Sequence, residues 1–339
     1  MLRSGLGCLV IGLLGIFSLQ GCKPSQGTPA KYRIAVIPKG TSHDFWKYIH
    51  AGAKHAERER GNTKILWDGP AKEDLRHEQQ QIVERFTSDR VDAIILAPSD
   101  RRTLTAPVEA AITIGIPVVI IDSGLELTDT IRKSDNYLGY VATDNRQGGV
   151  EAAKRMIDLL NGKERAKVVM VRYQAGSEST EQREAGFRET IKPASNIAFS
   201  EAPDEAGATV DSAQQVAERL LSDHKDIDGI FVPNESSTTG FLRALEVFNR
   251  AGEIKLVGFD ANKDLVHALR LGKLHGLVLQ DPFDMGYQSV QRALDHLQGK
   301  GLPKERVKNT NLKMVTRENM EDPAIKLLYD RDLAGFLDE

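Results

Sequence analysis

The sequence predicts an α/β protein made of two doubly wound parallel-sheet domains. Ten short apolar runs follow one another along the chain, and most are separated by about 10 to 20 residues in which apolar side chains recur with helical spacing. Strands that are apolar on both faces and alternate with helices are typical of right-handed βαβ units in a parallel sheet. Ten strands are many for one sheet, so we expect two sheets.

The predicted strands are apolar runs bounded by turn-forming residues. They cover residues 32–38, 63–68, 91–98, 116–122, 140–144, 166–173, 196–202, 228–234, 254–260 and 275–280. A polar stretch with a glycine, residues 123–136, breaks the alternation of strand and helix. We therefore expect the two domains to divide near Asp144.

Composition excludes several classes of protein. The chain has 339 residues, of which 40% are hydrophobic and 27% charged, enough for roughly two globular domains. A net charge of −3 shows no basic excess, so neither nucleic acid nor an anionic membrane surface is an expected electrostatic partner. The eight histidines are scattered, and no metal-ligand spacing is present. We expect no metal and no cofactor.

Residues 1–22 resemble a bacterial lipoprotein signal. Arg3 precedes an apolar run, residues 6–19, that is shorter than the ~20 residues needed to span a membrane. Cys22 would then carry the lipid and begin the mature protein. Because Gln20 is uncommon in such a box, an ordinary secretory signal or an uncleaved anchor is the alternative. No cysteine follows Cys22, so disulfide and thiolate chemistry are not expected in the mature chain. Residues 23–30 read as a flexible tether.

Polar side chains stand at the ends of several predicted strands. These residues are Ser99, Asp100, Asp122, Asn234, Asp260 and Gln280. Any one of them alone is best explained as a helix cap or turn residue. Ligands of doubly wound sheets bind beyond the carboxyl ends of the strands. Because these residues come from both halves of the chain, we expect most of them to line one cleft.

Two adjacent aromatic residues, Phe45 and Trp46, follow the first predicted strand. Carboxylates and carboxamides near an aromatic surface suit polyhydroxylated ligands, whose hydroxyls both donate and accept hydrogen bonds. The alternative for the rings is a place in the core or in a hydrophobic staple. Arg183, inside the helix that follows residues 166–173, either reaches the cleft or pairs with surface glutamates. Its residue type and position leave both options open.

Taken together, these motifs resemble the periplasmic sugar-binding proteins of ABC importers, of the ribose, galactose and xylose type, which are relatives of the lac-repressor ligand core. The resemblance covers residues 32 to about 316. It rests on DFWKYIHAGA, VDAIILAPSD, IPVVIIDS, ATDNRQGG, TEQREAGF, FVPNESSTTGFLRAL, LVGFD and LVLQDPFDMGY. It implies a type I periplasmic binding protein fold, whose two lobes are joined by a three-crossing hinge.

The resemblance also implies domain boundaries. The N-terminal ligand-binding lobe would comprise residues 31–143 and 281–311, and the C-terminal lobe residues 144–280 and 312–316. Residues 317–339 form a C-terminal extension, which we expect to pack on the surface as a short helix and to which we assign no function.

The family's ligand contacts fall on named positions of this chain. They are Phe45 and Trp46, as two rings that sandwich the sugar, and Asp122, Arg183, Asn234, Asp260 and Gln280. His43 stands where relatives have asparagine, and Ser123 stands where relatives have arginine beside the first aspartate. Both are possible contacts, and they indicate that the pocket is not a copy of a ribose pocket.

We therefore expect a substrate-binding lipoprotein that captures a monosaccharide or related polyol and delivers it to an ABC permease. The protein would be a monomer in the periplasm, held to a membrane of the bacterial cell envelope by its lipid. The alternative is a sensor that presents its sugar to a signalling receptor. An enzyme that uses Asp122 and Asp260 as a carboxylate pair is not expected, because no catalytic motif accompanies them.

Overall fold

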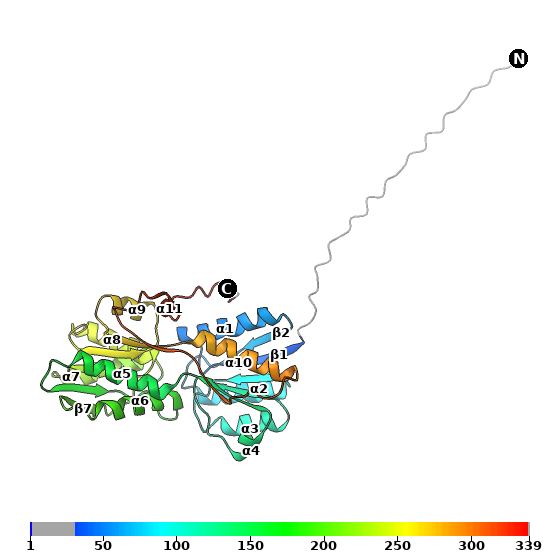
Figure 1. Cartoon of the computed structure of the whole chain (residues 1–339), viewed down its shortest axis with the longest axis horizontal. Helices are drawn as coiled ribbons and strands as arrows, with labels where there is room; N and C mark the ends of the chain where they lie inside the picture. The colour runs from blue at the N-terminus through cyan, green and yellow to red at the C-terminus, as the bar shows by residue number, and fades with distance from the viewer. Residues whose placement is uncertain (2–30, 338–339) are drawn as a thin grey trace.

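The structure, a computed structural model, describes Met1 and residues 31–337, in which strands and helices alternate along most of the chain (Figure 1). In chain order the elements are β1 (Tyr32–Ile37), α1 (Asp44–Arg60), β2 (Thr63–Trp67), α2 (Arg76–Ser88), β3 (Ala93–Leu96), α3 (Thr105–Thr113), β4 (Val118–Ile121), α4 (Asp129–Lys133), β5 (Tyr137–Ala142), α5 (Asn145–Leu159), β6 (Ala166–Met170), α6 (Glu178–Ile191), β7 (Ile197–Glu201), α7 (Val210–Asp223), β8 (Gly229–Phe231), α8 (Glu235–Val247), β9 (Lys255–Phe259), α9 (Lys263–Arg270), β10 (Gly276–Gln280), α10 (Pro282–Leu297), β11 (Val307–Asn309), β12 (Leu312–Val315) and α11 (Pro323–Lys326).

The strands form two six-stranded sheets with the same internal order. Lobe A is built on the sheet β11-β5-β4-β3-β1-β2, and lobe B on the sheet β12-β10-β9-β8-β6-β7. All neighbouring strands are parallel except β10 and β12, which pair antiparallel. The predicted fold class, two doubly wound parallel-sheet domains, is confirmed.

Each of the ten predicted strands overlaps an observed strand. β5 begins at Tyr137, three residues before the predicted start at Tyr140. β11 was not predicted, because its three residues are all exposed and carry no apolar signal. In the C-terminal extension, where a short helix was expected, α11 contains four residues.

Apolar strands pack between two helical layers in each lobe. All four residues of β3 and of β4 are buried, as expected for central strands of a covered parallel sheet. In lobe A one core lies under α1 and α10 and another under α2 and α3. In lobe B the cores lie under α7, α8 and α9 and under α5 and α6. Burial on both faces of each sheet leaves the strand ends as the place for polar residues.

Two helix pairs approach closely through glycines. An added Cβ at Gly52 of α1 would overlap the carbonyl oxygen of Phe283 in α10. In lobe B, an added Cβ at Gly149 of α5 would overlap the carbonyl oxygen of Arg183 in α6. Backbone contact of this kind leaves little freedom for either helix to shift. The helices α1 and α6, from which site residues project, are thereby held against their lobes.

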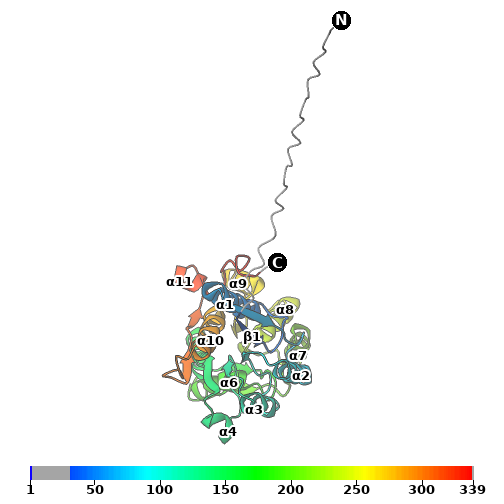
Figure 2. The same ribbon diagram turned by 90° about the vertical axis from the view of Figure 1, so that its right-hand side faces the viewer.

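The chain passes from one sheet to the other three times, between β5 and α5, between β10 and α10, and between β11 and β12. The two lobes therefore lie side by side along the long axis of Figure 1. Viewed from the lobe A end, α9 and α11 of lobe B lie on the same side of the molecule as α1 of lobe A (Figure 2). Among the described residues, no helix has the length and apolar character needed to cross a membrane.

Candidate functional site

A cavity lies between the lobes and is surrounded by side chains from both. Its lining residues are Lys39, His43, Phe45, Trp46, Glu73 and Asp122 from lobe A, and Ser179, Thr180, Arg183, Asn234, Glu235, Asp260 and Gln280 from lobe B. The seven residues that the sequence singled out as ligand contacts are all in this set, and so is His43. The structure thus brings together residues that are up to 241 positions apart in the chain, the separation of Lys39 and Gln280.

Two aspartates occupy corresponding places in the two lobes. Asp122 directly follows β4 and Asp260 directly follows β9, and these strands are third in the order of their sheets. Both residues have left-handed backbone angles, with φ of 60° and 62°. For a residue other than glycine this conformation costs about 1–2 kcal/mol. Such strain concentrates at functional positions, and here it accompanies two carboxylates that face the same cavity.

Each aspartate lies beside a buried cation. Lys39 Nζ is 2.8 Å from the Asp122 carboxylate and also donates to Ser179 Oγ at 2.9 Å across the lobes. Arg183 Nη1 is 3.8 Å from the Asp260 carboxylate, and the guanidinium lies over the ring of Phe259 at 4.1 Å.

Arg183 is fixed by further contacts inside lobe B. It donates to Asn145 Oδ1 at 2.8 Å and to the carbonyl oxygen of Pro233 at 2.9 Å. Its exposed fraction is only 2%, so the surface-pairing option that the sequence left open is wrong. Arg183 lines the cavity instead, and its role as a ligand contact stays a prediction.

The two carboxamides of the site have different surroundings. Asn234 caps α8, since its Oδ1 accepts a hydrogen bond from the backbone N–H of Ser237 at 3.2 Å, and it also lines the cavity. Gln280 donates from Nε2 to Asp260 Oδ1 at 2.6 Å. The Oε1 atom of Gln280 is buried and accepts no hydrogen bond from the described residues. A buried acceptor without a donor is costly, so this oxygen indicates a place for a donor in the cavity.

The aromatic pair both lines the cavity and packs in the core of lobe A. Phe45 is 8% exposed and Trp46 is 2% exposed. Their rings meet edge to face, with centroids 4.9 Å apart and planes at 86°. No ligand ring fits between two rings in that contact, so the sandwich that the resemblance implied is wrong in this structure. Either ring could cover a ligand from one side only.

Ser123 and Asp100 lie outside the cavity lining. Ser123 is fully buried, and its Oγ accepts a hydrogen bond from the backbone N–H of Ser179 at 3.1 Å, so it joins the lobes instead of facing the cavity. Asp100 caps its own turn through the N–H groups of Arg102 and Thr103. The cap alternative was therefore right for Asp100. Cys22 lies outside the described residues.

Sequence reasoning missed three charged lining residues, Lys39, Glu73 and Glu235. Lys39 stands two positions after β1, and the rule that found Asp122 would have found it. Glu73 belongs to a charged loop between β2 and α2, where no local signal separates it from its neighbours. Glu235 is the first residue of α8, where the helix dipole alone explains an acidic residue, so its type gives no sign of a ligand site.

His43 and Glu73 form a buried ion pair, with Nδ1 of the imidazole 3.0 Å from Glu73 Oε1. Burial lowers the pKa of His43, but the negative charge of Glu73 and its hydrogen bond outweigh burial and raise the pKa to about 9. Burial likewise raises the pKa of Glu73, whereas the charge and hydrogen bond of His43 lower it to about 2. Both groups are therefore charged across the neutral pH range.

Glu235 of lobe B reaches the first turn of α1 in lobe A. Its carboxylate accepts hydrogen bonds from the backbone N–H groups of Phe45 at 3.2 Å and Asp44 at 3.4 Å. Burial raises the pKa of Glu235 to about 7, although the charge of His43 opposes the shift. Burial also raises the pKa of Asp260, with Arg183 opposing. The site thus holds carboxyl groups of unequal acidity within one closed space.

The chain is similar to proteins of known family and structure. Residues 34–301 match the family model described as periplasmic binding protein domain. The ribose import binding protein of Bacillus subtilis is 30% identical over 310 residues, which cover 87% of this chain and 94% of that protein. The D-allose-binding periplasmic protein of Escherichia coli is 27% identical over 287 residues, which cover 84% of this chain and 91% of that protein.

A solved structure is similar over nearly the same span. It is an ABC transporter solute binding protein from Agrobacterium vitis with bound D-fucose, and it is 34% identical with a TM-score of 0.82. The alignment covers 88% of this chain and 99% of that one.

Glu235 makes stability depend on pH. The pKa of Glu235 in the folded protein, about 7, lies above its ordinary value of 4.5. The stability that it contributes is therefore present below about pH 4.5 and is lost as pH rises through 7. In Glu235→Gln this loss should be absent, because the carboxamide does not titrate, and its oxygen can still accept from the α1 amides. The free energy of unfolding of the variant, relative to that of the wild type, should therefore increase from pH 5 to pH 8, by roughly 3 kcal/mol at most.

Urea unfolding at the two pH values measures this gain. The exposed Glu164→Gln is the matched control and should track the wild type at both pH values. A Glu235→Gln difference that stays constant with pH would contradict the assigned shift.

Proposed function

This chain belongs to the periplasmic binding protein family, and from that premise we propose that it captures a monosaccharide or related polyol between its lobes and delivers it to an ABC permease. The observation that carries the proposal is the convergence of Asp122, Arg183, Asn234, Asp260 and Gln280, from both sheets, on one cavity. The relatives named for ribose and allose, and the neighbour with bound D-fucose, support a sugar as the ligand.

The charge balance of the cavity favours a neutral ligand. Three cationic side chains line it, and each faces a carboxylate: Lys39 faces Asp122, His43 faces Glu73, and Arg183 faces Asp260. Among the described lining residues no cation is left over for an anionic ligand. A sugar acid or phosphate would add uncompensated negative charge to a buried site, which is costly. Neutral hydroxyls instead use the hydrogen-bonding capacity that these pairs retain.

Specific atoms suit specific parts of a sugar. The free Oε1 of Gln280 can accept from one hydroxyl, and the carboxylates of Asp122 and Asp260 can accept from others. Arg183 and Lys39 keep donor hydrogens beyond those used in their pairs. The face of Phe45 or Trp46 can cover the apolar face of a pyranose or furanose ring from one side. In this assignment His43 is a further contact, and Ser123 is not.

Ligand contacts from both lobes would favour the closed arrangement and so shift the hinge equilibrium. The lobe boundaries are part of the proposal: residues 31–143 and 281–311 move against residues 144–280 and 312–316. The assignment of strands to the two sheets supports this division. A closed protein would then be recognised by the permease or, in the alternative end use, by a signalling receptor.

The proposed location is the periplasm, with a monomeric protein anchored through lipid on Cys22. The family supports the periplasm, and the pattern of Arg3, the apolar run and Cys22 supports the anchor. We propose no enzymatic activity.

A thermal-shift screen against monosaccharides, sugar alcohols, sugar acids and amino acids tests the ligand class. A ligand at 100 times its dissociation constant adds ~2.7 kcal/mol of stability, so a neutral sugar should raise the melting temperature by several degrees. In Asp260→Ala, the affinity for that sugar should weaken by at least ~2 kcal/mol, because a buried hydrogen-bonding partner is removed.

Asp68→Ala is the matched control, since Asp68 follows β2 at the same edge of a sheet but pairs with Arg85 at the surface. It should leave the affinity unchanged. A screen in which only amino acids or sugar acids give a shift would refute the proposed ligand class, and an unchanged affinity in Asp260→Ala would remove that residue from the site.

The lipid anchor predicts that Cys22→Ser moves the protein from the membrane to the soluble fraction of its native host. Fractionation followed by immunoblotting measures this. The control is Cys8→Ser, which changes the cysteine inside the apolar run before Cys22 and should stay membrane-bound. Continued membrane association of Cys22→Ser would instead indicate an uncleaved apolar anchor.

A further inference from the structure

The side chain of Glu73 is enclosed by three hydrogen-bond donors. Its Oε1 accepts from Trp46 Nε1 at 2.8 Å and lies 3.0 Å from His43 Nδ1, and its Oε2 accepts from the Tyr173 hydroxyl at 2.8 Å. Glu73 itself is 5% exposed. His43 and Trp46 line the cavity from lobe A, whereas Tyr173 follows β6 in lobe B. One carboxylate therefore joins two cavity-lining side chains to each other and to the opposite lobe.

We propose that Glu73 is a positioning residue of this site, which holds His43 and Trp46 in the orientation that a ligand meets and ties them to lobe B through Tyr173. The inference rests on the proposed function, because it concerns the same cavity. With Nδ1 held by Glu73 and the ring charged, Nε2 of His43 is a second donor that can serve a sugar hydroxyl. A neutral ring that donates from Nδ1 would present Nε2 as an acceptor instead.

The charged groups around the pair come from several elements. Besides each other, His43 faces Glu235 of α8 and Asp260 after β9, and Glu73 faces Lys39 after β1 and the hydroxyl of Tyr173. Burial has the largest influence on the pKa of His43 and lowers it, and Glu73 is the main group that raises it. Without the Glu73 charge, we expect His43 to lose its proton within the range from pH 5 to 8.

The test compares the sugar affinity of Glu73→Gln with that of the wild type by calorimetry at pH 5.5 and pH 8. Glu235 also titrates in this range and its pKa depends on the charge of His43, so the comparison is repeated in the Glu235→Gln background, which removes this titration. Gln retains the shape of Glu, so the ratio should be less than about threefold at pH 5.5 and about tenfold or more at pH 8. Tyr173→Phe keeps the His43–Glu73 pair, and its ratio should not change with pH.

The outcomes separate this inference from the proposed function. A wild type that binds no sugar would refute the function, and the Glu73 inference with it. Sugar binding by the wild type with a pH-independent Glu73→Gln ratio would overturn the Glu73 inference alone. If Glu73→Gln does not fold, NMR titration of the wild-type His43 ring decides: the ring should show no titration between pH 5 and 8, and a midpoint in that range would overturn the proposal.

A second inference concerns the strap, which we define as residues 321–336 of the C-terminal extension. Its first half is anchored on lobe B. Ile325 is 8% exposed and joins the apolar cluster under α9, and Arg270 of α9 donates to the Glu321 carboxylate at 2.9 Å. Tyr329 packs against the same cluster and donates its hydroxyl hydrogen to the carbonyl oxygen of Met320 at 2.7 Å.

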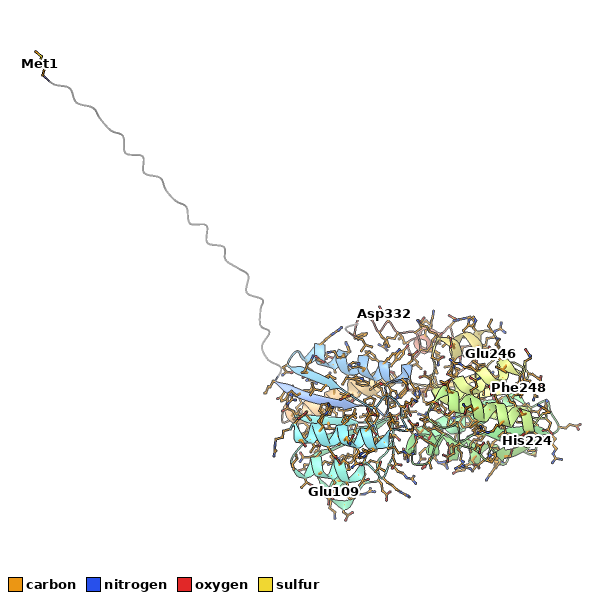
Figure 3. The ribbon with its side chains drawn as sticks, turned by 180° about the vertical axis from the view of Figure 1, so that it is seen from behind. Met1, Glu109, His224, Glu246, Phe248 and Asp332 are labelled. Atoms are coloured by element: carbon orange, nitrogen blue, oxygen red, sulfur yellow. The ribbon has the colours of Figure 1, made fainter. Side chains whose placement is uncertain are left out.

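The second half of the strap is anchored on lobe A. The guanidinium of Arg331 lies over the ring of Phe283 in α10 at 4.0 Å. The ring of Phe336 meets Phe283 at 5.2 Å and His55 of α1 at 5.3 Å. Arg58 of α1 donates to the carbonyl oxygen of Phe336 at 2.9 Å. Asp332 accordingly lies on the edge of the molecule between the two lobes (Figure 3), and the segment runs from α9 towards α1 in Figure 1.

The strap also borders the site. Leu328 lines a smaller cavity together with Phe45, Asp260 and Gln280, three residues that also line the main one. The geometry points to a role of the strap in closure. The strap is anchored on lobe B and contacts lobe A next to the main cavity, so it stabilises the closed arrangement of the lobes. Opening the lobes would have to detach Arg331 and Phe336 from α1 and α10.

The test uses the double variant Arg331→Ala/Phe336→Ala, which removes the lobe A anchors, and Tyr329→Phe, which alters only the lobe B anchor. In small-angle scattering without ligand, the double variant should have a larger radius of gyration than the wild type, and Tyr329→Phe should not. With the sugar found in the screen, the double variant should bind roughly tenfold more weakly, since binding must then supply the closure energy.

The scattering measurement needs no ligand, so its result does not depend on the proposed sugar. An unchanged radius of gyration in the double variant would overturn the closing role of the strap. If the double variant does not fold, a chain that ends at Asp330 lacks the same anchors and gives the same comparison.

Discussion

Burial of charge is the constraint on which the rest of this site depends. Seven ionisable side chains surround one cavity, and none is more than 8% exposed. They are Lys39, His43, Glu73, Asp122, Arg183, Glu235 and Asp260. An unpaired buried charge costs several kcal/mol, so the side chains must be arranged as pairs or must change protonation. Three cation–carboxylate pairs meet this requirement. The remaining carboxyl group, Glu235, accepts a hydrogen bond from a backbone N–H in the first turn of α1 and has a raised pKa.

Those pairings also connect the two lobes. Lys39 pairs with Asp122 in its own lobe and donates to Ser179 in the other, and Glu73 accepts from Trp46 in its own lobe and from Tyr173 in the other. The same polar groups therefore serve the site and the contact between the lobes. In the proposed function, a ligand that competes for these hydrogen bonds would contact both lobes at once. Contacts with both lobes would make the ligand bind the closed arrangement more tightly than the open one, which is the physical basis of the proposed hinge closure.

The repetition of one plan in both lobes explains where the site is. Both sheets have the same strand order, and the third strand of each is followed by an aspartate with a left-handed backbone. Both lobes also have a pair of helices in backbone contact through glycine, α1 with α10 and α5 with α6. When two such lobes face each other, their strand ends meet across one space. The position of the cavity is thus a property of the fold, whereas its lining is a property of this chain.

Local sequence was sufficient for the ten strands and for the polar residues at their ends. Apolar runs and the residue that follows each run are short-range signals, and they led to Asp122, Asn234, Asp260 and Gln280. The three-residue β11 and the loop residue Glu73 have no such signal, because their environment is formed by parts of the chain far away in sequence. The edge-to-face contact of Phe45 and Trp46 depends on the core of lobe A, and the position of Ser123 between the lobes depends on Ser179, 56 residues later.

The sequence by itself determined the fold class, the strand-end residues and the family, because each of these depends on patterns within a few turns of helix or one strand. The tertiary structure alone decided which charges are partners, which groups are left with free hydrogen-bonding atoms, and where the C-terminal extension runs. Pairing depends on distances of about 3 Å between residues that lie far apart in the chain, for example 140 positions apart for Lys39 and Ser179. No spacing along the chain encodes such a distance, since only packing of the two lobes brings the groups together.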